Sequence, residues 1–214
     1  MASLEVDLVS DFVCPWCWLG WAQFRQAKFD ADLTFRPYML DPLVPKEGRD
    51  YREYMKAKFG EGGGRFRAMR EHLEAAAPDA GISFNFDDIP KRPNTLDAHR
   101  LMRWAQGQDV GADCADALFK AYFQDLRDIG DAEVLSDIAG TVGLDGDLVR
   151  ELLSTDRDSD KVAEEINFFR RLGVSGVPTF IYNGEMAIQG AQDPDAHRTV
   201  AREVRKLGKK GGRK

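Results

Sequence analysis

Two cysteines three positions apart are the residues of this sequence best suited to chemistry. Cys14 and Cys17 enclose Pro15 and Trp16. They follow an apolar, strand-like segment and precede a segment with helical periodicity. Two thiols at a strand-to-helix junction can close and reopen a disulfide. The pair therefore indicates redox chemistry carried by the protein's own sulfur atoms.

The place of the pair in its helix predicts different roles for the two thiols. Cys14 is expected at the helix N-terminus, where unpaired N–H groups and the helix dipole favour an anion, so its thiol should ionise readily and act as the nucleophile. Cys17, about one turn further on, should be more shielded and should resolve a mixed disulfide by attacking Cys14. Pro15 presets the backbone of the first turn, and Trp16 supplies apolar surface. Both are expected to border the substrate.

The elements that must position these thiols form a β-α-β pattern. Leu4–Val9 alternates apolar and polar residues before it ends apolar, which predicts a strand. Trp21 and Phe24 recur four and seven positions after Cys17, a helical spacing. Leu33–Arg36 predicts a second strand. A Cys-x-x-Cys pair beside such a pattern, in a chain without an export signal, is typical of a thioredoxin-like redox motif.

A long helical block separates this unit from a second β-rich segment. Pro78 is expected to stop a helix inside the block, and Asn94 to cap the next one. Four parts are predicted: 1–45 with the Cys-x-x-Cys pair, the helical insertion 46–172, a C-terminal part 173–207, and a basic disordered tail 208–214. Helices are predicted at about 51–59, 66–77, 95–105, 112–126, 132–142, 147–153, 159–172 and 195–207, and strands at 179–182 and 186–188 around an Asn183-Gly184 turn.

Length, charge and composition exclude several classes of protein. The 214 residues, 43% of them hydrophobic, suffice for a sizeable core. A net charge of −6 argues against a general nucleic-acid binder, because phosphate neutralisation needs clustered lysine and arginine. No stretch approaches the ~20 apolar residues of a membrane span, and no secretory signal is visible. We therefore expect a cytoplasmic protein without membrane contact. Three cysteines are too few for a structural disulfide framework.

Three segments of the sequence resemble the DsbA family, and within it the cytoplasmic FrnE-like branch. They are Asp11–Gly20, Asn94–Leu101 and Gly176–Phe180; the first and third are the specific ones, and the likeness spans nearly the whole chain. The resemblance implies an α/β fold of the thioredoxin type, interrupted by a large all-helical insertion domain. It also implies a cis bond before Pro178, beside the thiols, with the Val177 backbone available to pair with an extended substrate.

Several other reactive residues have both a structural and a functional interpretation. Asp11 could assist proton transfer or shape a turn. His99 could carry a proton, or could be a solvated or hydrogen-bonded histidine. Cys114 is expected to be a small buried hydrophobe. A zinc site is disfavoured because there is no second Cys-x-x-Cys pair and the histidines, His72, His99 and His197, are scattered.

The sequence thus favours a thiol-disulfide oxidoreductase that exchanges disulfides with protein, peptide or small-thiol substrates through Cys14 and Cys17. No metal or organic cofactor is expected; glutathione is a candidate redox partner, and a homodimer is left open. One alternative is a glutathione-dependent isomerase or transferase of the kappa or hydroxychromene-carboxylate type, which resembles this layout but typically has serine in place of Cys14. Another is a peptide-binding or chaperone-like module in which the thiols are incidental.

Overall fold

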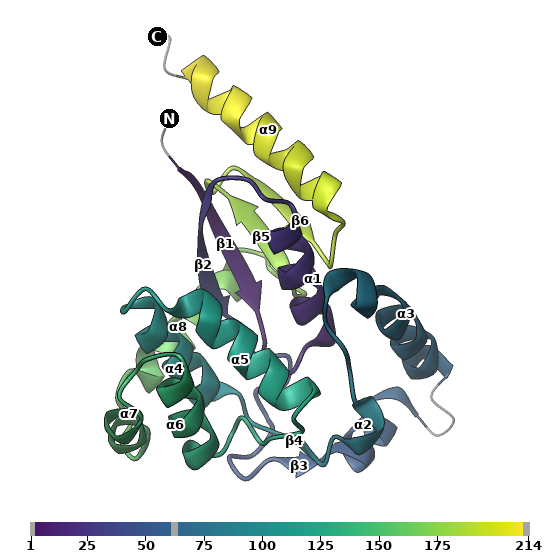
Figure 1. Ribbon diagram of the computed structural model, residues 1–214, viewed down its shortest axis with the longest axis vertical. Coiled ribbons are helices and arrows are strands. Elements are labelled where there is room, and N and C mark those ends of the chain that lie inside the picture. The colour runs from purple at the N-terminus through teal and green to yellow at the C-terminus, as the bar shows by residue number, and fades with distance from the viewer. Residues whose placement is uncertain (1–2, 61–63, 212–214) are drawn as a thin grey trace.

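A four-stranded sheet forms the centre of the fold, and its strands come from both ends of the chain (Figure 1). The computed structural model describes residues 3–60 and 64–211. The strands of this sheet are β1 (Leu4–Ser10), β2 (Ala31–Pro37), β5 (Thr179–Tyr182) and β6 (Met186–Gln189). β1 pairs in parallel with β2 and antiparallel with β5, which pairs antiparallel with β6. The strand order is therefore β2-β1-β5-β6.

Helices build most of the chain between β2 and β5 and occupy the lower part of the molecule in Figure 1. This arrangement confirms the predicted α/β fold of the thioredoxin type with a helical insertion. The division at residues 45, 172 and 207 stays a prediction. The helices are α1 (Pro15–Gln26), α2 (Tyr51–Phe59), α3 (Gly64–Ala80), α4 (Leu96–Gln106), α5 (Gly111–Phe123), α6 (Ala132–Thr141), α7 (Gly146–Leu153), α8 (Ser159–Arg171) and α9 (Pro194–Gly211), and a second sheet joins β3 (Arg49–Asp50) to β4 (Lys91–Arg92).

The two faces of the central sheet bury apolar residues against different helices. Leu8 of β1 pairs with Phe180 of β5, so both side chains lie on one face. There the Phe180 ring lies 5.5 Å from that of Phe24 in α1 and 4.6 Å from that of His197 in α9. On the opposite face, Val9 packs in a cluster with Phe169 of α8. The strand period of two thus fixes which helix each residue meets.

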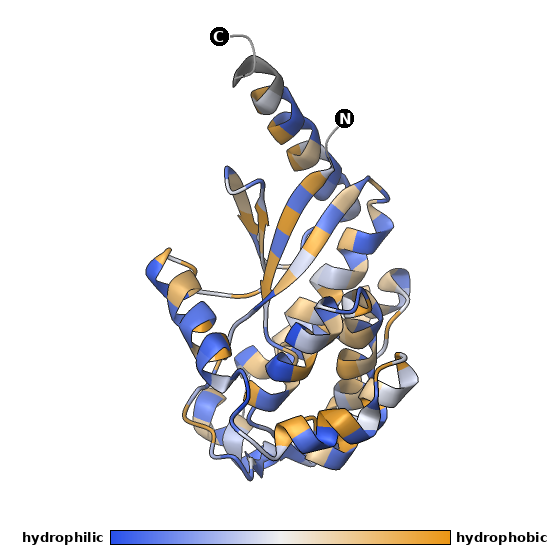
Figure 2. Ribbon diagram, turned by 90° about the vertical axis from the view of Figure 1, so that its left-hand side faces the viewer, coloured by the Kyte–Doolittle hydropathy of each residue, from blue (hydrophilic) through white to orange (hydrophobic). Residues whose placement is uncertain are grey.

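The hydropathy of the chain follows this layering. Apolar and polar residues alternate along the strands and around the helices rather than forming long apolar runs (Figure 2). Across 3–60 and 64–211, no helix is both long enough and apolar enough to cross a membrane.

Two local expectations are wrong, and one strand pairing was not predicted. α3 continues through Pro78 to Ala80, because a proline in the last turn removes few helical hydrogen bonds. Asn94 does not occupy the cap position of α4, which belongs to Thr95; instead its side chain accepts a hydrogen bond from the Leu96 amide at 3.0 Å. The pairing of β3 with β4 was not predicted, since two-residue strands carry no periodicity.

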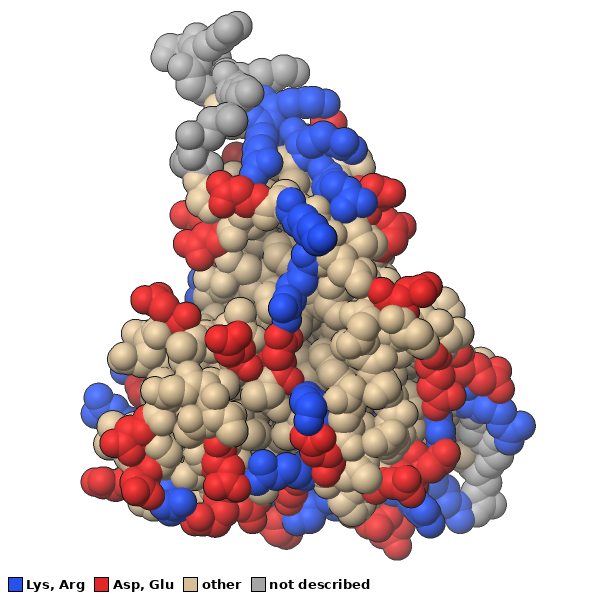
Figure 3. Space-filling view, viewed as in Figure 1, with Lys and Arg blue, Asp and Glu red and all other residues tan. Residues whose placement is uncertain are grey.

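The predicted disordered tail is also wrong over part of its length. α9 extends to Gly211, so residues 208–211 are helical, and 212–214 lie outside the described residues. Lysines are good helix formers, and cations in a last turn complement the helix dipole. Lys and Arg side chains gather along α9 in the space-filling view (Figure 3). Of these, Arg205 donates to the Asp30 carbonyl at 2.6 Å and so ties α9 to the start of β2.

A buried arginine of α4 holds the segment that connects α7 to α8. The Arg100 side chain is 2% exposed. Its guanidinium donates at 2.8 Å to each of three carbonyls in that link and lies 2.7 Å from the Asp97 carboxylate. The carbonyls belong to Leu152, Thr155 and Arg157. Arg100 therefore anchors the start of α8, the helix that leads into the Val177-Pro178 loop.

Candidate active site

The two thiols lie at the first turn of α1, as the sequence predicts. Cys14 is the cap residue with an extended backbone, φ −97° and ψ 111°, and Pro15 follows at the first helical position. The Cys17 amide donates to the Cys14 carbonyl at 3.0 Å, which closes the turn. Both side chains are buried, Cys14 with 4% of its surface exposed and Cys17 with none. The helix therefore presents Cys14 toward its open end and holds Cys17 beneath it.

The electrostatic environment separates the two thiols. A hydrogen bond from the Cys17 thiol lowers the pKa of Cys14 below its ordinary value, in spite of burial, and the Arg92 guanidinium acts in the same direction. Burial, together with the same contact to Cys14, raises the pKa of Cys17 well above its ordinary value. Of the two thiols, Cys14 is the one that ionises first.

The loop between α8 and β5 brings Val177 and Pro178 against Cys14. The peptide bond between them is cis. The Cys14 Sγ donates to the Val177 carbonyl oxygen at 3.8 Å, a contact between residues 163 positions apart. Gly20 allows α1 to approach this loop closely, because a Cβ there would lie 3.0 Å from the Pro178 side chain. The structure thus brings together the residues of the two sequence motifs.

The rim of the site is formed by Trp16 and α3. Trp16 and Pro15 are both half-buried beside the thiols. The Trp16 ring contacts the imidazole of His72, with centroids 5.3 Å apart. His72 itself is exposed. The partial exposure of Trp16 is compatible with its expected position beside a substrate, but the sequence gives no indication that α3 reaches the site.

Asp11 lies below the thiols as a buried carboxylate. It is 1% exposed. Its Oδ2 accepts from the Leu40 amide at 2.8 Å, and its Oδ1 lies 3.7 Å from Nε2 of His99. Burial alone would raise the pKa of Asp11, but His99, Arg92 and the Leu40 amide together lower it. The negative charge of Asp11 in turn raises the pKa of both cysteines.

Arg92 is a site residue that sequence reasoning missed. It is 3% exposed. Its Nη1 donates to the Val13 carbonyl at 3.0 Å, and its guanidinium lies 5.0 Å from the centre of the Tyr54 ring. Arg92 thus supplies a fixed positive charge behind the thiols. The sequence shows only an arginine next to Pro93, without a spacing that relates it to the thiols.

The remaining reactive residues agree with their structural interpretations. His99 is buried rather than solvated, and its Nε2 donates to the Tyr38 carbonyl at 3.0 Å. Cys114 is fully buried, and burial raises its pKa to about 12. A thiol of that kind is inert at neutral pH.

Alkylation should distinguish the three thiols by their pKa values. At mildly acidic pH, an alkylating reagent is expected to label Cys14 well ahead of Cys17 and Cys114, because only Cys14 has a lowered pKa. In Cys17→Ala, the hydrogen bond to the Cys14 sulfur is gone, so the onset of Cys14 labelling should move to higher pH. Mass mapping across a pH series measures both effects. First reaction at Cys114, or an onset unchanged in the variant, would contradict the assignment.

Comparison with known proteins agrees with this fold. The family model of DSBA-like thioredoxin domains matches residues 5–200. A probable DsbA oxidoreductase from Streptomyces coelicolor is 28% identical and superposes with a TM-score of 0.84 over 92% of this chain and 88% of its own.

Two further solved structures show the same fold at lower identity. A 2-hydroxychromene-2-carboxylate isomerase is 16% identical, with a TM-score of 0.68 over 97% of this chain and 98% of its own. The cytosolic disulfide reductase DsbM of Pseudomonas aeruginosa, solved with GSH, is 18% identical, with a TM-score of 0.67 over 94% and 99%. Because the family model covers nearly the whole chain, the protein belongs to the DSBA-like thioredoxin domain family.

Proposed function

We propose that this protein is a thiol-disulfide oxidoreductase with Cys14 as nucleophile and Cys17 as resolving thiol. The observation that carries the proposal is the 3.8 Å contact between Cys14 Sγ and the Val177 carbonyl. It sets the thiol of lower pKa beside a backbone group that can pair with the main chain of an extended substrate. Pro15, Trp16, Val177 and Pro178 would border that substrate.

The exchange proceeds in two balanced steps. The Cys14 thiolate attacks one sulfur of a substrate disulfide, so that a mixed disulfide forms and the other substrate sulfur leaves as a thiolate. The Cys17 thiolate then attacks Cys14, which releases the second substrate thiolate and leaves a Cys14–Cys17 disulfide. Two electrons pass from the protein to the substrate, and the reverse sequence oxidises a substrate dithiol.

Asp11 is suited to assist the second step. Cys17 must lose a proton before it attacks, although burial holds its pKa high. The Asp11 carboxylate is ionised and buried nearby, and its Oδ1 has no hydrogen-bond partner among the described residues. The lowered pKa of Asp11 makes it a weak base, so it would hold this proton only transiently, while the Cys17 sulfur attacks. Asp11→Asn should therefore slow resolution of the mixed disulfide more than its formation.

The partners of the reaction follow from the same chemistry. The protein's own cysteines carry the electrons, so the proposed cycle needs no metal or organic cofactor, and substrates would be protein, peptide or small-molecule disulfides and thiols. Glutathione is the candidate redox partner, since DsbM shares the fold and was solved with GSH. We place the protein in the FrnE-like branch and in the cytoplasm, in keeping with the motifs of the sequence.

A glutathione-dependent isomerase or transferase is the second candidate. The likeness to the 2-hydroxychromene-2-carboxylate isomerase fold favours it. The complete Cys14/Cys17 pair with divergent pKa values favours disulfide exchange instead, because an isomerase would not need a resolving thiol.

Reduction of a protein disulfide separates the two candidates. With insulin as substrate and reduced glutathione as electron donor, the parent protein should accelerate reduction in proportion to its concentration. The same preparation should show no comparable turnover of a hydroxychromene carboxylate. Isomerase turnover without catalysed insulin reduction would overturn the proposal in favour of the second candidate.

A further inference from the structure

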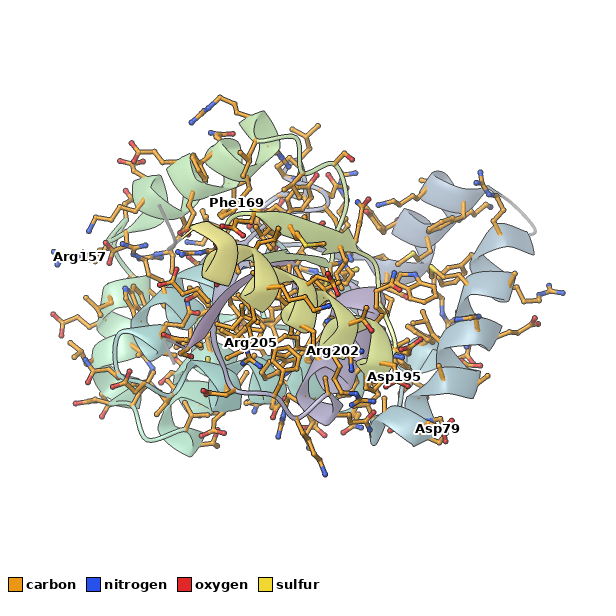
Figure 4. The ribbon with its side chains drawn as sticks, turned by 90° about the horizontal axis from the view of Figure 1, so that it is seen from above. Asp79, Arg157, Phe169, Asp195, Arg202 and Arg205 are labelled. Atoms are coloured by element: carbon orange, nitrogen blue, oxygen red, sulfur yellow. The ribbon has the colours of Figure 1, made fainter. Side chains whose placement is uncertain are left out.

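A groove of about 1180 Å³ runs along β2 at the edge of the central sheet. Trp21 and Phe24 of α1 line one side of it, and Leu148 of α7, half of whose surface is exposed, lines another. Arg157, a lining residue, lies on the opposite side of the molecule from Asp79 of α3 (Figure 4). Although α1 contributes to both, the residues that line the groove do not include Cys14, Cys17, Val177 or Pro178, so the groove is separate from the candidate active site.

The edge of β2 that faces this groove carries backbone groups able to pair with another strand. β2 pairs with β1 on its other side. At Phe35, the side-chain amide of Gln106 takes the place of a neighbouring strand: the Phe35 N–H donates to Gln106 Oε1 at 2.6 Å, and Gln106 Nε2 donates to the Phe35 carbonyl at 3.2 Å. These are the two hydrogen bonds that a residue of an added strand would form.

The backbone groups of two more β2 residues face the same side as those of Phe35. Because the direction of backbone groups alternates along a strand, Leu33 and Ala31 direct their N–H and C=O groups to the same side as Phe35. Both residues line the groove. In Figure 2, which faces this side of the molecule, the upper part of the strands is seen without a helix across it. Ala31 and Leu33 are partly exposed and line the groove, whereas Phe35 is buried and Gln106 closes the edge there.

The polarity of the groove walls determines which side chains a bound strand would need. The Phe35 ring packs on that of Trp21, with centroids 5.0 Å apart, so the Leu33 and Phe35 face of β2 is apolar. The other face is polar, since Arg36 projects there and its Nη1 lies 3.0 Å from Glu165 of α8. An added strand would therefore meet an apolar wall with every second side chain and a polar wall with the others.

We propose that this edge binds an extended segment of a partner polypeptide, with apolar residues at alternate positions, as an additional strand beside β2. The backbone groups of Ala31 and Leu33 provide the hydrogen bonds, and the wall formed by Trp21 and Phe24 receives the apolar side chains. Binding is independent of the two thiols. It holds whether or not the proposed disulfide exchange is correct.

A designed peptide and one edge variant test this binding. A capped, fluorescent peptide of roughly seven residues, alternating valine and threonine, should bind the parent protein saturably with Kd below about 1 mM. Leu33→Pro removes the outward N–H without touching the β1 pairing, because edge strands tolerate proline on their free side. It should weaken binding about tenfold. Phe168→Ala removes an exposed ring elsewhere on α8 and should leave peptide binding unchanged. Insulin reduction by Leu33→Pro should match that of the parent protein.

Backbone methylation of the peptide tests the same point on the unmodified protein. N-methylation at alternate peptide positions should abolish binding, while methylation at the positions between them should not, because only one set of amides faces β2. Failure of the parent to bind, or equal effects at all positions, would overturn the proposal. A concentration-dependent dimer that is lost in Leu33→Pro would show that a second copy of the chain occupies the edge, and would overturn it as well.

Discussion

Replacing Cys17 by alanine is expected to trap substrates on Cys14 as mixed disulfides. Without the resolving thiol, the first exchange step proceeds and the second has no intramolecular nucleophile. Cys14→Ser should instead lower the rate of disulfide exchange by about a thousandfold or more, since the residue that attacks the substrate is gone. Non-reducing electrophoresis and mass spectrometry of the variants, after incubation with a disulfide substrate, measure both outcomes.

Cys114→Ser is the matched control for these variants. It removes a thiol that is fully buried and whose pKa is raised to about 12, so exchange should continue at the parent rate. Trapping of substrate on Cys17 in Cys14→Ser, or normal exchange by Cys14→Ser, would reverse or refute the assigned roles.

Replacing Arg100 by alanine is expected to cause the largest loss of stability in the helical part of the chain. The change removes a buried guanidinium and its hydrogen bonds to the carbonyls of Leu152, Thr155 and Arg157, of which the Leu152 carbonyl still accepts from the Thr155 hydroxyl at 2.8 Å. Breaking a buried charge network by removing one partner costs about 3–5 kcal/mol. For a chain of this size the thermal midpoint should fall by about 6–20 °C.

Arg103→Ala provides the comparison on the same helix. The Arg103 side chain is 43% exposed and lies 3.7 Å from Glu165, so its ion pair is screened by solvent. Its loss should cost no more than about 1 kcal/mol. Chemical denaturation of both variants measures the difference. Equal losses would show that Arg100 does not anchor the link between α7 and α8.

The fold could be predicted where the pattern in the chain is local. The alternation in Leu4–Val9 predicts β1, and the β-rich run Leu33–Arg36 predicts β2. Both segments lie within the strands of the structure. The short β3 and β4 carry no such period, and their pairing depends on chain segments brought together by the fold. α3 runs past Pro78 because a proline near a helix end costs little in hydrogen bonding.

For the same reason, only part of the candidate site could be predicted from the sequence. Cys14 and Cys17 share one helical turn, so their spacing carries the information. Val177 comes to Cys14 across 163 positions, and only the family resemblance connected the two motifs. Arg92 was not visible at all, because it acts through burial and through a bond to the Val13 carbonyl 79 positions away.

A redox titration in glutathione buffers tests the central claim that Cys14 and Cys17 form a redox-active pair. The parent protein would be equilibrated over a range of reduced to oxidised glutathione, quenched with acid, alkylated and mapped by mass spectrometry. We expect a single reversible, two-electron transition between a dithiol and an intramolecular Cys14–Cys17 disulfide, with Cys114 reduced throughout. Absence of that disulfide across the whole range, or a transition that involves Cys114, would contradict it.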